Sequence, residues 1–377
     1  MKLTVVAVTL LVQGITVSQG IARGQALAGG ENVASYALGP NWSGFGSPDE
    51  QQPAGQPQPA QTASASSDAS RPRTEGSMIG YLEDATIGSQ VRIRSEGGFD
   101  AQFPDRAEFF YAKCGCFKSN LAGSGLPAFD PKSPGPGPGV VTKLNFQQLY
   151  MQGEYAPHRR LSVFVEVPIR WIQPMGFVPG FGSFGNQGGL GDVTAGVKAA
   201  IIASRKQYLT VQLKSYFPSG DASKGLSTGH YSIEPSLLYY QALPNRMALE
   251  SEIGIWAPIG GAAGVASATN STPQGFAGNI LFYGVGPSYQ LVRREHFHFS
   301  PVVELVGWSV LGGFQTVWIS ATRTADLVGG TNIVNIKIGA RTDIGGGNSF
   351  YIGYGRALTS AVWYSDLVRF EFRHAFR

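Results

Sequence analysis

The segment Gly188–Asp221, GGLGDVTAGVKAAIIASRKQYLTVQLKSYFPSGD, decides between a nucleotide-binding enzyme and a β protein. Its Gly191–Gly196 stretch has the glycine spacing of a P-loop, which requires a lysine after the second glycine, then serine or threonine, then a helix. Val197 occupies the lysine position, and Lys198 stands where serine or threonine is required. From Val193 onward, apolar residues alternate with polar or small ones at the period of a β-strand. The segment is therefore predicted to be a β-hairpin.

The composition excludes several classes of protein. The chain has 377 residues, of which 51 are glycine and only 14% are charged, a low fraction for a soluble globular protein. Its 29 basic and 25 acidic residues are interspersed and leave a net charge of +4. The chain has no basic run with interleaved aromatic residues, so no nucleic acid partner is expected.

The N-terminus predicts an exported protein. Lys2 is followed by an apolar run to Val12, and Ala26-Leu27-Ala28 fits a signal-peptidase site. Ser18-Gln19-Gly20 and Ala22-Arg23-Gly24 would also serve as cleavage sites. Residues 1–28 are therefore expected to be a signal peptide. No later stretch offers ~20 apolar residues without charge, which excludes a helical inner-membrane protein.

Three further segments follow the expected signal peptide. Residues 29–77 are rich in Pro, Gln, Ala and Ser and predict a disordered linker, because they cannot bury enough apolar surface to order themselves. Residues 78–104 are expected to be a periplasmic or lumenal lead-in, with an extra strand or part of a plug as alternatives. Residues 105–377 are expected to form a β-barrel in the outer membrane.

The barrel is predicted from the alternation of short turns with long Gly/Pro/Ser-rich loops. This alternation places the long loops at one end, as in outer-membrane barrels, whereas a soluble sandwich has no reason to sort its loops. The sequence therefore predicts an all-β fold, a transmembrane antiparallel up-and-down β-barrel of about 12 strands. The expected strands are Arg106–Cys114, Val141–Ala156, Leu161–Pro174, Leu190–Ser204, Gln207–Pro218, His230–Leu243, Arg246–Pro258, Ala277–Val292, Phe297–Leu311, Thr331–Ile344, Ser349–Thr359 and Trp363–Phe376.

The two faces of these strands differ in chemistry. Aliphatic residues occupy the face expected to meet lipid, and charged residues of both signs occupy the other face. Aromatic residues near strand ends, among them Trp171, Trp256, Trp308 and Trp363, are expected in interfacial girdles. The charged side chains predicted to line the lumen are Glu166, Arg170, Lys198, Lys214, Glu234, Glu250, Glu252, Glu304, Lys337, Arg341, Arg369, Glu371 and Arg373.

Several short motifs carry a family resemblance. Gly189–Thr194 opens one strand, Phe217–Asp221 ends the next with Pro-Ser-Gly-Asp, and Glu234-Pro235 lies in the third. With Pro104-Asp105-Arg106 before an aromatic run, these motifs resemble the outer-membrane barrel family named for the meta-pathway of phenol degradation. The resemblance covers roughly Pro104–Phe376. It implies an outer-membrane protein that passes small, aromatic or apolar compounds.

No catalytic, metal or cofactor site is expected. Cys114 and Cys116 form Cys-Gly-Cys, for which a local disulfide and two inert thiols both remain open. His230, Ser232 and Glu234 share a strand face, but residues two apart on a strand are expected to stand ~7 Å apart, too far for a catalytic relay. The chain is therefore not expected to be an enzyme.

Two functions remain in competition. A narrow channel or transporter for small solutes predicts a continuous polar lumen, whereas a sealed structural or surface-display barrel predicts a plugged one. A barrel hydrolase and a secreted soluble β protein are less favoured alternatives. The expected partners are outer-membrane lipid, the barrel assembly machinery and a small-molecule solute.

Overall fold

The computed structural model describes residues 77–102, 141–180, 182–260, 265–267, 270–274, 277–319 and 322–376. The expected signal peptide, all of the expected linker except Ser77, the expected strand Arg106–Cys114, and Cys116 lie outside these residues.

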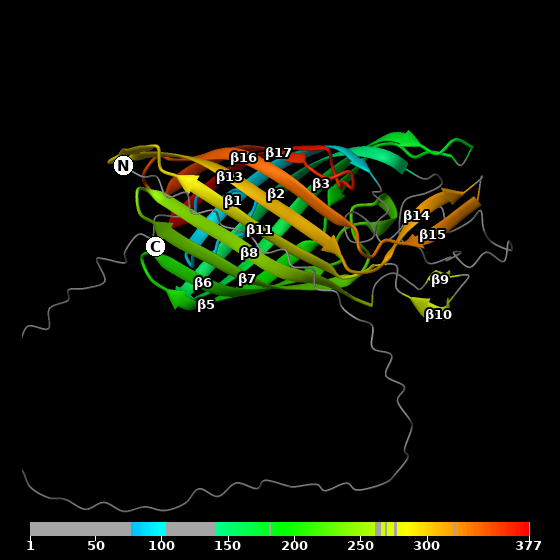
Figure 1. Ribbon diagram of the computed structural model, residues 1–377, viewed down its shortest axis with the longest axis horizontal. Helices are drawn as coiled ribbons and strands as arrows, with labels where there is room; N and C mark the ends of the chain where they lie inside the picture. The colour runs from blue at the N-terminus through cyan, green and yellow to red at the C-terminus, as the bar shows by residue number, and fades with distance from the viewer. Residues whose placement is uncertain are drawn as a thin grey trace, which may run out of the picture. The chain divides into compact units, whose positions relative to one another are not determined.

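Twelve long strands in the described part of the chain form one closed antiparallel barrel, which confirms the predicted fold (Figure 1). Neighbouring strands pair in sequence order, and the barrel is closed by the pairing of the first strand with the last. The strands are β1 (Ser89–Gln102), β2 (Val141–His158), β3 (Leu161–Phe177), β5 (Val193–Ala203), β6 (Gln207–Phe217), β7 (Tyr231–Leu243), β8 (Met247–Ile259), β11 (Ile280–Tyr289), β13 (Phe297–Val310), β16 (Asn332–Asp343), β17 (Asn348–Ala357) and β18 (Asp366–Phe376).

The barrel begins earlier than the sequence suggested. We expected Arg106–Cys114 to be the first strand, but its place in the wall is taken by β1, which pairs with β18 on one edge and β2 on the other. The main-chain groups of β1 complete both ladders, and this leaves no open edge in the barrel. The expected lead-in at 78–104 therefore contains a wall strand in its second half.

The connections are sorted by length as predicted. Short turns join β2 to β3, β5 to β6, β7 to β8, β11 to β13 and β16 to β17, and the other connections are longer. The longer connections include β4 (Gln187–Leu190), the 3-10 turn η2 (Ala222–Lys224), and the hairpins β9 (Val265–Ser267)–β10 (Asn270–Gln274) and β14 (Phe314–Ile319)–β15 (Thr322–Leu327). The short strand β12 (Val292–Arg294) lies in the β11–β13 connection. No helix in the described residues is long and apolar enough to cross a membrane.

The outward face of the barrel is aliphatic and aromatic. Along β3, Val163 and Val165 are 48% and 49% exposed, while the intervening Phe164 is buried. Ile338 on β16 and Phe370 on β18 are likewise more than half exposed. A continuous apolar surface of this kind is unfavourable in water and favourable in lipid.

Candidate functional site

Residues Ser77–Gly88, here called the lumenal segment, lie inside the barrel. The Met78 amide donates to Glu250 on β8 at 3.0 Å, and the Thr210 hydroxyl on β6 donates to the Ala85 carbonyl at 2.6 Å. Asp84 pairs with Arg373 on β18 at 3.0 Å. Only a segment within the lumen can reach wall strands so far apart around the ring. The first part of the expected lead-in therefore lies in the lumen.

The segment enters and leaves at the same end of the barrel. Ser77 contacts Arg373, near the end of β18, through its carbonyl at 3.4 Å. The chain then reaches the level of Glu304 in the middle of β13 and returns to Ser89, which pairs with Phe376. Both ends of the segment therefore lie at the short-turn end.

Three wall carboxylates, here called the acidic arc, receive the main-chain N–H groups of the segment. They are Glu250 and Glu252 on β8 and Glu304 on β13. The donors are Met78 to Glu250 (3.0 Å), Gly80, Tyr81 and Leu82 to Glu304 (3.3, 2.9 and 2.9 Å), and Glu83 to Glu252 (2.9 Å). These five bonds satisfy the main-chain N–H groups of the segment without any strand partner.

Three arginines, here called the basic arc, bind the carbonyl groups of the same segment. They are Arg341 on β16 and Arg369 and Arg373 on β18. Arg373 donates to the Ser77 carbonyl (3.4 Å), Arg341 to those of Met78 and Ile79 (3.4 and 2.7 Å), and Arg369 to that of Gly80. The wall thus satisfies the main chain of the segment in the way that neighbouring strands satisfy each other in a sheet.

The ring of Tyr81 is held by two cations and by a second aromatic ring. Lys337 Nζ lies 4.0 Å and Arg369 Cζ 4.1 Å from the centroid of its ring, both within cation–π range. The ring of Tyr351 meets it edge-on, with centroids 6.0 Å apart. The preceding Gly80 approaches Tyr351 so closely that a Cβ at residue 80 would lie 2.2 Å from that ring. Any larger residue there must displace the segment or a buried tyrosine.

The apolar side chains of the segment fill a small core of their own. Met78, Ile79 and Leu82 pack with Val302 and Val306 of β13. On β11, Gly284 makes room for this core, because a Cβ at that position would lie 2.2 Å from a Leu82 methyl group.

Glu83 adds ion pairs on the other side of the lumen. Its carboxylate lies 3.0 Å from Lys214 Nζ on β6 and 3.6 Å from Arg92 on β1. Burial alone would raise the pKa of Glu83, but these two cations lower it well below its usual range. The segment is therefore anchored by its charge as well as by its main chain.

All thirteen charged residues predicted to line the lumen lie on the inward face. Nine are buried, and Glu166, Arg170, Lys214 and Glu252 are half-buried. Wall pairs join Lys198 to Glu154 (3.2 Å), Lys214 to Glu234 (2.8 Å), Arg94 to Glu166 (3.3 Å), Arg369 to Glu96 (2.6 Å), and Glu371 to Arg341 and Arg373 (2.8 and 3.2 Å); Arg170 donates to Gln148 (3.4 Å).

Sequence reasoning missed several members of this network. Arg92, Arg94 and Glu96 lie on β1, which we did not count as a strand, although they alternate with the outward residues Val91 and Ile93 as other wall residues do. That alternation was the signal that could have identified them.

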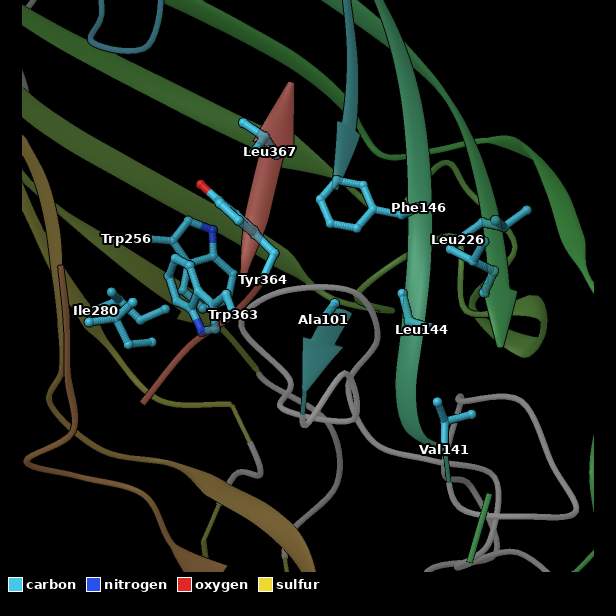
Figure 2. Packing of buried hydrophobic residues seen from close by; sticks show 12 residues of the cluster. Ala101, Val141, Leu144, Phe146, Leu226, Trp256, Ile280, Trp363, Tyr364 and Leu367 are labelled. Atoms are coloured by element: carbon cyan, nitrogen blue, oxygen red, sulfur yellow. The ribbon is translucent and has the colours of Figure 1, made fainter. Parts of the chain in front are cut away.

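Buried apolar side chains pack together at the long-connection end of the lumen (Figure 2). The middle of the lumen is charged instead. We call this cluster the apolar tier, and its buried members are Ala101, Val141, Leu144, Phe146, Ile172, Leu226, Trp256, Ile280, Ile333, Trp363, Tyr364 and Leu367. Lys337 links the two regions by donating to the Tyr364 hydroxyl at 2.6 Å.

The tier corrects one expectation about the aromatic residues. Trp256 and Trp363 are buried in it, and Trp308 packs against Trp363 with ring centroids 4.7 Å apart. They do not belong to an outward girdle, whereas Trp171 is 45% exposed as expected. A strand-end position alone does not determine the face on which a side chain lies.

The residues of the family-like motif join two long connections. Asp192 accepts from the amides of Gly220 and Thr228 at 3.2 and 2.9 Å. The Ser219 hydroxyl donates to the Gly191 carbonyl at 2.9 Å. These motif residues therefore tie the two connections together. Residues 188–221 contain a hairpin, as predicted, and not a P-loop followed by a helix.

One pair approaches more closely than we expected. Ser232 Oγ on β7 lies 3.2 Å from Nδ1 of His230, which directly precedes this strand. Glu234, the third candidate of a relay, is instead bound by Lys214 and by the hydroxyl of Tyr216. Among the described residues, no carboxylate hydrogen-bonds this histidine, and no three His, Cys, Asp or Glu side chains group as metal ligands.

Comparison with known proteins gives only distant structural likenesses. No family model matches the chain, and no curated protein matches it. An outer membrane channel from Pseudomonas putida F1 is similar with a TM-score of 0.46 and 14% identity, over 79% of this chain and 99% of that one. The β domain of the Bordetella autotransporter BrkA (TM-score 0.43, 14% identity, 77% and 100% covered) and the translocator domain of the autotransporter NalP from Neisseria meningitidis (0.38, 10%, 77% and 88%) are also similar. Because identity and TM-score are low in all three, we base no functional inference on them.

Proposed function

We propose that this protein is a bacterial outer-membrane channel for small solutes that is closed by its own lumenal segment. The observation that carries the proposal is the way in which the segment is held. It belongs to no strand ladder and is bound by wall side chains through at least nine main-chain hydrogen bonds. A closed barrel with an apolar outer face and sorted loops supports a membrane location.

The competing function is a sealed barrel with no transport. The wall-to-wall ion pairs favour it, since they would keep a small barrel filled. The acidic arc favours the channel. In the described residues, Glu250, Glu252 and Glu304 form no ion pair with any wall cation. Apart from the Tyr351 hydroxyl, which donates to Glu304, their hydrogen-bond donors come from the segment. A permanently sealed barrel has no need for wall carboxylates that depend on a separate segment.

The solute class is proposed from the apolar tier and from the family resemblance. The apolar tier, which contains Phe146, Trp256, Trp363 and Tyr364 at the long-connection end, favours aromatic or apolar solutes over ions. The phenol meta-pathway family resemblance implies the same class. We further propose that the protein is exported by its signal peptide and inserted into the outer membrane by the barrel assembly machinery.

Single-channel recording in a planar bilayer tests this function. The full chain is compared with a chain that lacks residues 29–88, a deletion that keeps β1 and removes the lumenal segment. We expect rare or no steps from the full chain and frequent, discrete steps from the deleted chain. A folded barrel that is silent in both forms would exclude the channel and leave the sealed barrel.

A further inference from the structure

Most hydrogen bonds between the lumen wall and the segment are made to the main chain of the segment rather than to its side chains. Of the contacts between the wall and Ser77–Glu83, five use main-chain N–H groups and four use main-chain carbonyls. Donors face the acidic arc and acceptors face the basic arc. Such an arrangement is the side-chain equivalent of strand addition, in which main-chain hydrogen bonds give affinity.

In the described residues the carboxylates of the acidic arc form no ion pair with a wall cation, and each arginine of the basic arc, although it pairs with a wall carboxylate, also donates to the segment. Glu250 and Glu304 are 1% and 0% exposed, and Arg341 is 1% exposed. Buried carboxylates and guanidinium groups need hydrogen-bonding partners, which an extended peptide supplies on both of its edges.

The wall residues that face the segment are small or aliphatic. The wall meets the segment with the small residues Gly284 and Gly286 and with Val302 and Val306. This surface suits small or aliphatic side chains, and the cations Lys337 and Arg369 suit an aromatic ring.

We propose that the lumen is a binding site for short extended peptides, which occupy the place of the lumenal segment and displace it. The inference deepens the proposed function, since it assumes that the segment can leave the lumen. The site is formed by the acidic arc and the basic arc, and it accepts any main chain that offers free N–H groups to Glu304 and carbonyls to Arg341.

The test uses hydrogen exchange of the full chain in detergent, because amides bound by buried carboxylates exchange slowly until the segment leaves. A tethered segment has a high effective concentration, so a free peptide competes better when the segment is weakened. The Gly80→Ala variant weakens it through the clash with Tyr351 and is measured beside the unaltered chain. The probe is penta-alanine, and its matched control is penta-alanine methylated at every peptide nitrogen, which has no N–H to donate.

We expect penta-alanine to accelerate exchange of the amides of residues 80–82 several-fold in Gly80→Ala, with a smaller effect in the unaltered chain. The methylated peptide should leave exchange unchanged. Equal effects of the two peptides, or no effect of either in Gly80→Ala, would overturn the inference. The readout does not require conduction, so silence in the bilayer with faster exchange here would contradict the channel and leave the peptide site standing.

Discussion

The barrel wall and the lumenal segment are both extended chains, but they are held in different ways. A wall strand such as β3 is bound on both edges by main-chain ladders to β2 and β5. The lumenal segment is bound by wall side chains, mainly Glu304, Arg341 and Arg369. We therefore expect the wall to come apart only when the fold does, and the segment to be released by changes to a few side chains. The predictions below test that difference, from the largest expected effect to the smallest.

Replacing Glu304 should release the segment most strongly. Its carboxylate accepts three main-chain N–H groups and the Tyr351 hydroxyl. Each hydrogen bond to a charged group contributes about 1.5–3 kcal/mol, although the values are not additive. In Glu304→Ala we expect the amides of residues 80–82 to lose their exchange protection while the barrel stays resistant to denaturant. Unchanged protection would mean that the segment is held by something else.

Replacing Arg369 should have the second-largest effect on release of the segment. It pairs with Glu96 at 2.6 Å, donates to the Gly80 carbonyl and faces Tyr81. Breaking a buried ion pair costs roughly 3–5 kcal/mol, part of which falls on the wall itself. Arg369→Gln should therefore raise channel opening and also lower thermal stability.

The matched control is Arg356→Gln, which breaks an exposed pair with Asp366 at 3.5 Å. Exposed pairs contribute about 0–1 kcal/mol, so neither opening nor thermal stability should change measurably. Similar effects of the two substitutions would contradict a special role of the lumenal arginine.

The ring of Tyr81 should matter and its hydroxyl should not. Tyr81→Ala removes two cation–π contacts, each about 0.5–2 kcal/mol, and should raise the open fraction in bilayer recordings roughly tenfold. Within the described residues the Tyr81 hydroxyl has no hydrogen-bond partner. Tyr81→Phe should therefore behave as the unaltered chain, and a large effect of this variant would place the anchor at the hydroxyl.

Acid should loosen the segment moderately through Glu83. Because the pKa of this carboxyl is lower in the lumen than its ordinary 4.5, its contribution is complete above pH 4.5 and is lost as pH falls further towards the lowered value. Amide exchange corrected for intrinsic pH dependence should reveal faster opening below this pH. In Glu83→Gln that pH dependence should be weaker, and an identical profile would assign it to another group.

Much of the fold could be predicted because a barrel wall repeats one local rule. The alternation in Leu161–Trp171 and the sorting of connections by length sufficed for the inward charges and for eleven of the twelve wall strands. The segment could not be placed in this way, since Met78 and Leu82 find their partners Glu250 and Glu304 more than 170 residues away. The first strand was missed for another reason. The aromatic run after Pro104 resembles the first barrel strand of the family. The expected start of the barrel was therefore placed after β1.

The residues of the site could be predicted from the sequence, but their binding partners could not. Glu250, Glu304, Arg341 and Arg369 were identified as lumenal from alternation alone. Whether such charges pair with each other, face water or bind a chain depends on what enters the lumen, which periodicity does not contain.

The central claim is that the lumenal segment closes the channel, and one pair of glycines tests it most directly. An added Cβ at Gly80 meets the Tyr351 ring at 2.2 Å, whereas at Gly88 it meets nothing within 4 Å. Overpacking of this kind costs about 1–3 kcal/mol, which corresponds to roughly a tenfold change or more in open fraction. Single-channel recording of Gly80→Ala and Gly88→Ala should give frequent openings in the first and the behaviour of the unaltered chain in the second. An equal frequency of openings in the two folded variants would contradict the account.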